Sequence, residues 1–200
     1  MTDGARYNFV LVGVGGQGIL LASNILTEVG LAAGYDVKKS EVHGMSQRGG
    51  SVVSHVRWDR EGVRSPLVGH AEADMLVAFE RLEALRFADF LKPGGTAVVN
   101  DMEIVPVTVS AGGATYPDQA VVTATFEALA ATMITVPGER LATAAGNIKA
   151  ANVVLLGAIS TRLALPEETW RACLTQRVPA KFLDLNLTAF AMGRRVALAA

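Results

Sequence analysis

The sequence predicts a single α/β domain over residues 1–200, with a Rossmann-like, open and mostly parallel sheet and a helical C-terminal third. Apolar runs rich in β-branched residues alternate with helical periodicity up to residue 136, and helical periodicity alone follows. Half of the residues are hydrophobic, which suffices for one core. No internal repeat, low-complexity tract or Pro/Ser-rich linker divides the chain.

The first half contains five predicted strands bounded by glycine, proline or polar residues. They cover residues 7–12, 36–42, 51–58, 74–79 and 96–100. A helix over residues 19–33 follows the first strand. A second helix follows the fourth strand and has Leu82, Leu85, Ala88 and Leu91 on one face. Lys92-Pro-Gly-Gly95 is expected to end that helix.

The second half is predicted to be mainly helical. Residues 132–136 form the last expected strand, and Pro137-Gly138 ends it. Asn147 is expected to cap a helix through Ile159, and Pro166 lies in the first turn of a helix through Trp170. The final helix carries a stripe at heptad-like spacing, formed by Phe182, Leu185, Ala189, Met192 and Val196. Such a stripe suggests a surface that pairs with a partner or a second copy.

Composition and charge exclude several classes of protein. The 18 Lys and Arg residues against 19 Asp and Glu give a net charge of −1, which argues against nucleic-acid binding. Charged residues make up 18%, below the roughly 25% of soluble domains, so part of the surface is expected to be covered in an assembly. The longest uncharged run, residues 7–27, is broken by glycines and favours a strand–turn–helix over a membrane span. Without a basic signal-peptide region, a cytoplasmic protein is expected.

Few residues in this chain are suited to catalysis. Cys173 is the one cysteine, so the chain alone cannot hold a disulfide, a CxxC redox pair or an iron–sulfur cluster, and Cys173 is expected to be a small core residue. The histidines His43, His55 and His70 lack metal-ligand spacing, so no metal site is predicted. Nucleophile elbows, Walker loops and the Gly-Asp-Gly pattern of thiamine enzymes are absent from the sequence.

A glycine-rich motif, Gly13-Val-Gly-Gly-Gln-Gly18, lies between a predicted strand and a predicted helix. In that context Gly13, Gly15, Gly16 and Gly18 are candidates for binding a nucleotide phosphate at the helix N-terminus. Glu41, near the end of the second predicted strand, is the candidate acidic partner of such a ligand. The same glycines also allow the helix to pack closely on its strand, and the motif does not choose between these interpretations.

A polar loop, His43-Gly-Met-Ser-Gln-Arg-Gly-Gly50, follows the second predicted strand, at the edge of the sheet where open α/β proteins bind ligands. His43, Gln47 and Arg48 are the candidates near a shared active site, because they can titrate, orient a polar group and bind an anion. The alternative is a hydrogen-bonded loop at a subunit contact, in which Arg48 pairs with a carboxylate. The remaining residues of that interface loop are Met45, Ser46, Gly49 and Gly50.

Three further segments have simpler interpretations. Arg64-Ser-Pro66 is expected to be a turn. Glu80, Glu83 and Arg86 are expected to form a solvated helix face with i,i+3 pairing. Asn152, on an otherwise apolar helix, is expected to satisfy a buried backbone group or a partner.

Taken in order, these motifs resemble the gamma-type subunits of 2-oxoacid:ferredoxin oxidoreductases, and the resemblance covers essentially the whole chain. Pyruvate-type members carry a Gly-Pro-Glu-x-Arg-Gly-Gly loop where this chain has residues 43–50, which favours the indolepyruvate or aryl-pyruvate subtype. Besides the glycine motif and this loop, the resemblance rests on Arg64-Ser-Pro66, Ala73-Asp74, Phe79-Glu80, Lys92-Pro-Gly-Gly95, Gly146-Asn-Ile-Lys149, Asn152, Leu156-Gly157, residues 181–186 and Ala189-Phe190.

The resemblance implies a subunit of a hetero-oligomer, with contacts between two copies left open. The larger partner would hold thiamine diphosphate and [4Fe-4S] clusters. The complex would oxidise an aryl-2-oxoacid to an acyl-CoA with release of CO2 and reduction of ferredoxin, and the isolated chain would be inactive. Two rivals remain: a free-standing NAD(P)- or flavin-dependent oxidoreductase that uses the glycine turn, and a non-catalytic scaffold subunit.

Overall fold

Six strands form one mixed sheet in the computed structural model, which describes residues 6–43, 50–113 and 115–200. The strands are β1 (Arg6–Val14), β2 (Asp36–His43), β3 (Ser51–Asp59), β4 (Ala73–Ala78), β5 (Leu91–Asn100) and β6 (Thr132–Val136). Their order is β2-β3-β1-β4-β5-β6. The pairs β1–β4, β4–β5 and β5–β6 are parallel. β3 lies between β1 and β2 and is antiparallel to both.

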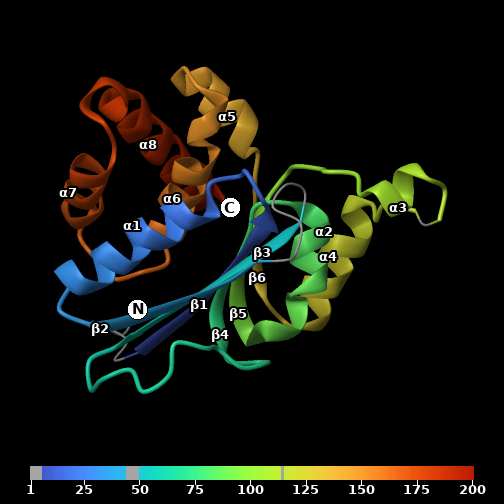
Figure 1. The fold of residues 1–200 in the computed structure, drawn as a ribbon, viewed down its shortest axis with the longest axis horizontal. Helices are drawn as coiled ribbons and strands as arrows, with labels where there is room; N and C mark the ends of the chain where they lie inside the picture. Colours follow the sequence, from blue (N-terminus) through green and yellow to red (C-terminus); the bar gives the residue numbers. More distant parts are fainter. Residues whose placement is uncertain (1–5, 44–49, 114) are drawn as a thin grey trace.

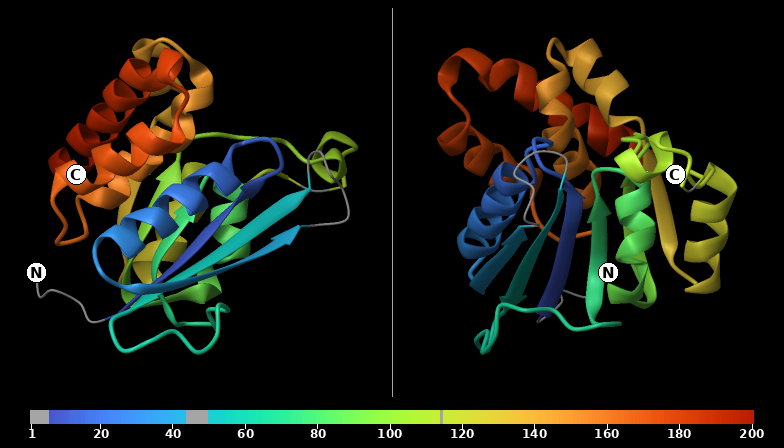
Figure 2. Two further views of the ribbon diagram at one scale, coloured as in Figure 1. Left: turned by 60° about the vertical axis from the view of Figure 1, so that its left-hand side comes forward. Right: turned by 45° about the vertical axis from the view of Figure 1, so that its right-hand side comes forward.

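Helices cover both faces of the sheet, which gives the predicted α/β architecture (Figure 1). One face carries α1 (Ile19–Ala32), α5 (Gly138–Ala145), α6 (Ala151–Ser160), α7 (Glu167–Arg177) and α8 (Leu183–Ala199). The other face carries α2 (Arg81–Arg86) and α4 (Gln119–Ala128), and the short α3 (Val107–Ser110) lies on a projecting segment. Three short 3-10 turns are η1 (Ala88–Phe90), η2 (Ile148–Ala150) and η3 (Ala180–Phe182). The helical C-terminal third is confirmed (Figure 2).

Alternation along β1 divides the apolar core between the two faces of the sheet. Phe9 and Leu11 point into the cluster beneath α1, α6 and α8, whereas Val10 and Val12 point into the cluster beneath α2 and α4. All four side chains are fully buried, as a strand covered by helices on both faces requires. None of the helices in the described ranges combines the length and the apolarity needed to cross a lipid bilayer.

The helices α6 and α8 meet backbone to backbone at two glycines. A Cβ on Gly157 would lie 2.1 Å from the Phe190 carbonyl oxygen, and a Cβ on Gly193 would lie 1.9 Å from the Val154 carbonyl oxygen. Both distances are far inside van der Waals contact, so no side chain fits at either position without separating the helices. The apolar stripe of the last helix lies partly in the core and partly at the surface, because Leu185, Met192 and Val196 are half-buried. Of its predicted members, Ala189 is fully buried, while Phe182 stays 39% exposed.

The segment around residues 86–95 differs from its prediction. The helix after β4 ends at Arg86, and Lys92-Pro-Gly-Gly95 lies inside β5 instead of ending a helix. The pairing with β4 moves from Ala73–Leu91 directly to Met75–Thr96, so residues 92–95 form a bulge. Gly94 adopts a φ of 73°, a backbone conformation that glycine permits. The Pro-Gly-Gly signal marks a real irregularity, but one within a strand.

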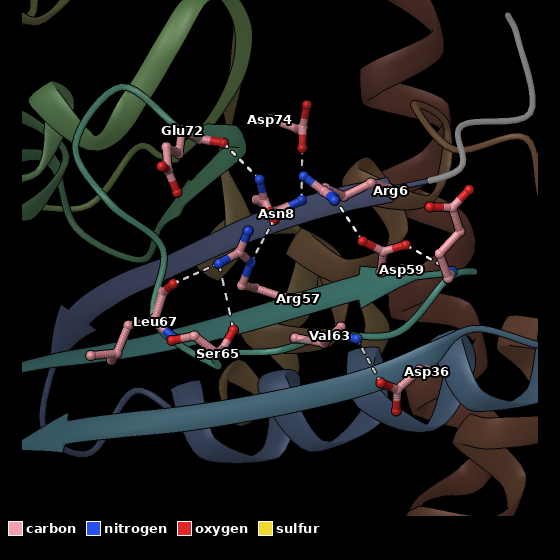
Figure 3. Close-up of polar contacts among 11 residues, drawn as sticks. Arg6, Asn8, Asp36, Arg57, Asp59, Val63, Ser65, Leu67, Glu72 and Asp74 are labelled. Carbon is pink, nitrogen blue, oxygen red and sulfur yellow. Dashed lines mark hydrogen bonds and ion pairs between the residues drawn. The ribbon is translucent and has the colours of Figure 1, made fainter.

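The Arg64-Ser-Pro66 segment lies in an irregular strap, residues 60–72, at the end of the sheet opposite the glycine motif. Figure 3 shows the polar contacts that hold this strap. The Arg57 guanidinium on β3 holds it, because Nε donates to Asn8 Oδ1 at 2.9 Å and Nη1 donates to the Leu67 carbonyl at 3.0 Å. The Val63 amide also donates to Asp36 Oδ2 at 2.7 Å. The strap is therefore fixed to β1, β2 and β3 by polar contacts.

Acid should weaken the attachment of this strap through His55. His55 on β3 is buried, its Nδ1 accepts the Val68 amide at 3.3 Å, and burial lowers its pKa below the usual 6.5. The unfolded chain therefore binds the proton more readily, so stability is complete above pH 6.5 and falls as the pH drops toward the lowered pKa. Denaturant unfolding at pH 8 and pH 5.5 should show this loss, and His55→Gln should reduce it. The same change at exposed His70 serves as the control, and an equal effect there would contradict the assignment.

Candidate functional site

A cavity of about 480 Å³ opens where the parallel strands β1, β4, β5 and β6 end at one edge of the sheet. We call it the glycine-turn cavity. The glycine motif after β1 forms one wall, the segments after β4 and β5 form the floor, and the starts of α5 and α6 form the other wall. Its lining includes Gly16, Gln17, Gly18, Asn100, Lys149 and Asn152. The carboxyl edge of a parallel sheet is where open α/β proteins bind ligands.

The Gln17 side chain fixes the glycine turn to the ends of two strands. Its Oε1 accepts the Val14 amide at 2.7 Å, and its Nε2 donates to the Phe79 carbonyl at 2.8 Å and to Met102 Sδ at 3.2 Å. A Cβ on Gly13 would lie 2.6 Å from Gln17 Oε1 and 2.8 Å from the Phe79 Cβ. The first glycine of the motif is therefore required for packing, as the structural interpretation expects.

Two further glycines of the motif, Gly16 and Gly18, line the cavity beside the start of α1. Gly16 and Gly18 have φ values of 105° and 79°, and open space surrounds the Cβ position of Gly16. No side chain within residues 6–43, 50–113 and 115–200 caps the N-terminus of α1 at Gly18. The amide groups of this first turn carry the positive end of the helix dipole, which favours an anion nearby.

The start of α6 supplies the opposite wall of the cavity. Asn152 is buried, and its Nδ2 donates to the Gly18 carbonyl at 3.3 Å, so the expectation that it satisfies a buried backbone group is confirmed. Asn147 caps η2 by accepting the Lys149 amide at 3.0 Å. The Lys149 side chain is exposed at the cavity and has no carboxylate partner among the described residues. It supplies a positive charge beside the glycine turn, and Glu139 at the start of α5 adds a carboxylate to the same lining.

Asn100 is a site residue that the sequence pattern did not identify. Its Oδ1 accepts the Gly138 amide at 2.9 Å and its Nδ2 donates to the Phe79 carbonyl at 3.1 Å, so it joins the ends of β4 and β5 to the start of α5. The side chain is only 2% exposed. A polar amide directly after the apolar run Ala97–Val99 is the signal that could have found it.

A hydrogen bond joins the glycine motif to the end of the polar loop. The Gly15 amide donates to the Gly50 carbonyl at 3.0 Å, and the Ser51 hydroxyl donates to Glu83 Oε2 at 2.5 Å. The end of the loop thus lies between the glycine turn and α2. The candidates Met45, Ser46, Gln47, Arg48 and Gly49 lie outside the described residues, as does the side chain of His43, so their roles stay predictions.

The prediction that Glu80 and Glu83 lie on a solvated helix face is wrong, because each residue is only 1% exposed. The predicted i,i+3 pair is present, since Arg86 Nη1 lies 2.6 Å from Glu83 Oε1. Glu80 caps α2 and also accepts the Ile104 amide at 3.0 Å and the Tyr116 hydroxyl. Burial and this carboxylate raise the pKa of Tyr116 well above its ordinary value. Both carboxylates therefore fix chain segments beside the site.

Glu41 lies apart from the glycine turn, because β3 separates β2 from β1. Glu41 is in register with Ser54, and Ser54 is in register with Leu11, so two strand spacings, about 10 Å, separate Glu41 from β1. In a dinucleotide-binding βαβ unit the second strand lies closer to the first. Glu41 Oε1 instead pairs with Lys39 at 2.7 Å. Its role toward a ligand stays a prediction that this arrangement does not favour.

Residues 8–196 match the protein family described as pyruvate ferredoxin/flavodoxin oxidoreductase. The chain belongs to this family. It is 44% identical to the indolepyruvate oxidoreductase subunit IorB of Thermococcus kodakarensis and 38% identical to that of Archaeoglobus fulgidus. Each alignment covers 195 residues, 96% of this chain and 96% of the relative. The recognition of a gamma-type subunit from its motifs is confirmed.

Structures of other oxidoreductases share this family fold. The gamma subunit of a keto/oxoacid ferredoxin oxidoreductase from Geobacter sulfurreducens aligns with a TM-score of 0.72 and 26% identity, over 97% of this chain and 99% of that one. The 2-oxoglutarate:ferredoxin oxidoreductase of Magnetococcus marinus aligns with a TM-score of 0.78 and 22% identity. This chain covers only 32% of that longer chain, so the gamma-type fold also occurs as one part of a larger polypeptide.

Proposed function

We propose that residues 1–200 act as one gamma-type domain, the small subunit of a cytoplasmic indolepyruvate:ferredoxin oxidoreductase. The complex would oxidise indolepyruvate or a related aryl-2-oxoacid to an acyl-CoA, release CO2 and reduce ferredoxin. Family membership and the IorB relatives support this assignment. The observation that carries it is the glycine-turn cavity, which opens at the carboxyl edge of the sheet and presents Lys149 there.

We also propose that the large partner subunit holds the cofactors. Thiamine diphosphate supplies the electron sink that decarboxylation of a 2-oxoacid requires. The donor set of this chain does not fit an iron–sulfur cluster, because Cys173 is the one cysteine, it is buried, and burial raises the pKa of its thiol. No group of three or more potential metal ligands gathers within the described ranges. The residues of this chain therefore fit binding and positioning.

The glycine-turn cavity fits the phosphate groups of CoA. Gly16 leaves open space, no described side chain caps the N-terminus of α1, and Lys149 adds a positive charge. The Magnetococcus marinus enzyme, which shares this fold, was determined with coenzyme A bound. A free-standing NAD(P) or flavin enzyme is disfavoured, because β3 separates Glu41 from the turn. The glycine-turn cavity favours a subunit that binds a ligand over a non-catalytic scaffold subunit.

Purified chain should fold yet oxidise no indolepyruvate, whereas mixing it with the large subunit should restore activity. In that complex, Lys149→Ala should raise the KM for CoA about tenfold, because it removes a charge that meets phosphate, and should leave the KM for indolepyruvate nearly unchanged. Lys149→Arg should retain most of the affinity. The control is Arg140→Ala, which removes an exposed charge on α5 outside the cavity lining.

Two results would contradict the proposal. Turnover of indolepyruvate by the pure chain, with thiamine diphosphate and an artificial electron acceptor supplied, would assign the chemistry to this subunit. Micromolar binding of NADH, NADPH or FAD would favour the free-standing oxidoreductase.

A further inference from the structure

A second hollow of about 340 Å³ lies beside the glycine-turn cavity, where α1, the start of α6 and the connection from α7 to α8 meet. We call it the corner groove. Its apolar part is formed by Leu21, Val178, Pro179, Phe182 and Leu185. Phe182 keeps 39% of its surface exposed, and Ile148 nearby keeps 52%. The groove shares Leu21, Lys149 and Asn152 with the glycine-turn cavity, so the two hollows are adjacent.

The surroundings of the corner groove are positively charged. Lys149 and Arg177 line it, and no carboxylate does. The Lys181 ammonium lies 4.8 Å from the centre of the Phe182 ring. Arg177 pairs with Glu28 at 3.0 Å, whereas Lys149 and Lys181 have no carboxylate partner in the described part of the chain. An apolar floor with unpaired cations at its margin suits an apolar side chain flanked by carboxylates.

Charge is also unevenly distributed along the whole chain, with an excess of positive charge in the C-terminal helices. Residues 138–200 carry eight Lys and Arg side chains against four Asp and Glu, although the full sequence has a net charge of −1. The helical layer is therefore basic and the remainder of the chain is acidic. A two-fold symmetric contact between two copies through this layer would bring like charges together, which disfavours a second copy as the occupant.

We infer that the corner groove is a docking site for an acidic segment of the large subunit, with an aliphatic or aromatic side chain seated on Phe182 and a carboxylate paired with Lys181. The inference rests on the proposed function, since it takes the large subunit as the partner. Because the groove and the glycine-turn cavity share Leu21 and Asn152 in their linings, the docked segment would lie beside that cavity.

The test compares two double variants that change the same charge and remove one exposed apolar side chain each. Lys181→Glu with Phe182→Ser changes the groove. Arg195→Glu with Leu198→Ser changes the far part of α8, where Leu198 is 70% exposed. Titration of the large subunit with each purified chain, at low and moderate salt, gives the dissociation constants. The groove variant should bind at least about tenfold more weakly and with a smaller salt dependence, and the control should stay within about threefold of wild type.

Each outcome decides the inference. Thermal unfolding verifies that both variants fold, and Lys181→Glu alone, a change of an exposed residue, should weaken binding in the same direction. Equal affinity of wild type and groove variant for the large subunit overturns the groove and leaves the proposed function intact. No binding by wild type overturns both. A groove variant that loses only self-association would make a second copy the occupant and would overturn the large subunit as partner.

Discussion

Gly193→Ala is expected to destabilise the protein by about 3 kcal/mol, the upper part of the range for overpacked sites. The added methyl would lie 1.9 Å from the Val154 carbonyl oxygen, so α8 must move away from α6. The sign of the change in the free energy of unfolding distinguishes an obstructed site from an open one. Replacing glycine by alanine within an unobstructed helix stabilises the helix by about 1 kcal/mol. Urea unfolding of wild type and variant measures the difference in the free energy of unfolding.

The double variant with Gly157→Ala provides the control. Gly157 occupies the corresponding position on α6, where a methyl would lie 2.1 Å from the Phe190 carbonyl oxygen. Separating the helices relieves both clashes at once, so the double variant should lose less than the sum of the single losses. A Gly193→Ala protein as stable as wild type would show that the two helices do not meet backbone to backbone.

Asn100→Leu is expected to cost about 1–3 kcal/mol, the usual cost of a buried polar group left without a partner. The change leaves the Gly138 amide without its acceptor and removes one of the two amides that donate to the Phe79 carbonyl. Leucine is similar in size, so the effect reports on hydrogen bonding. Asn186, which is only half-buried and whose Nδ2 donates to the Phe182 carbonyl, provides the control, and Asn186→Leu should change stability by less than about 0.5 kcal/mol. A loss of that small size for Asn100→Leu would contradict the role given to its side chain.

Local patterns predicted most strands and helices, because burial on a helix or strand leaves a periodic signature. The strand predicted at 132–136 matches β6, and the helix predicted at 19–33 matches α1 within one residue. Periodicity says nothing about which strands become neighbours. The position of β3 between β1 and β2 is set by long-range pairing, and it separates Glu41 from the turn. The bulge at residues 92–95 was missed because a Pro-Gly-Gly run also ends helices.

The candidate site was only partly predictable for a similar reason. The glycine motif was recognised because its glycines form a spaced pattern, and the meeting of Gly15 with Gly50 joins it to the polar loop. The amides of Gln17 and Asn100 act on backbone groups from distant segments, and a single amide leaves no pattern. The i,i+3 spacing of Glu83 and Arg86 correctly predicted their ion pair. Burial of Glu80 depends on the segment that carries Ile104 and Tyr116, which lies further along the chain.

The sheet order has a consequence for the nascent polypeptide. β1 is the first strand to be synthesised, yet its neighbours are β3 and β4, which pair Val10 with His55 and with Leu76. The chain must therefore leave the ribosome as far as β4 before both edges of β1 are covered, and residues 9–12 expose side chains that are fully buried at the end. Until then the N-terminal strand is an apolar segment with open edges, the kind that aggregates or recruits chaperones. The subunit that a partner can bind exists only after this delayed closure.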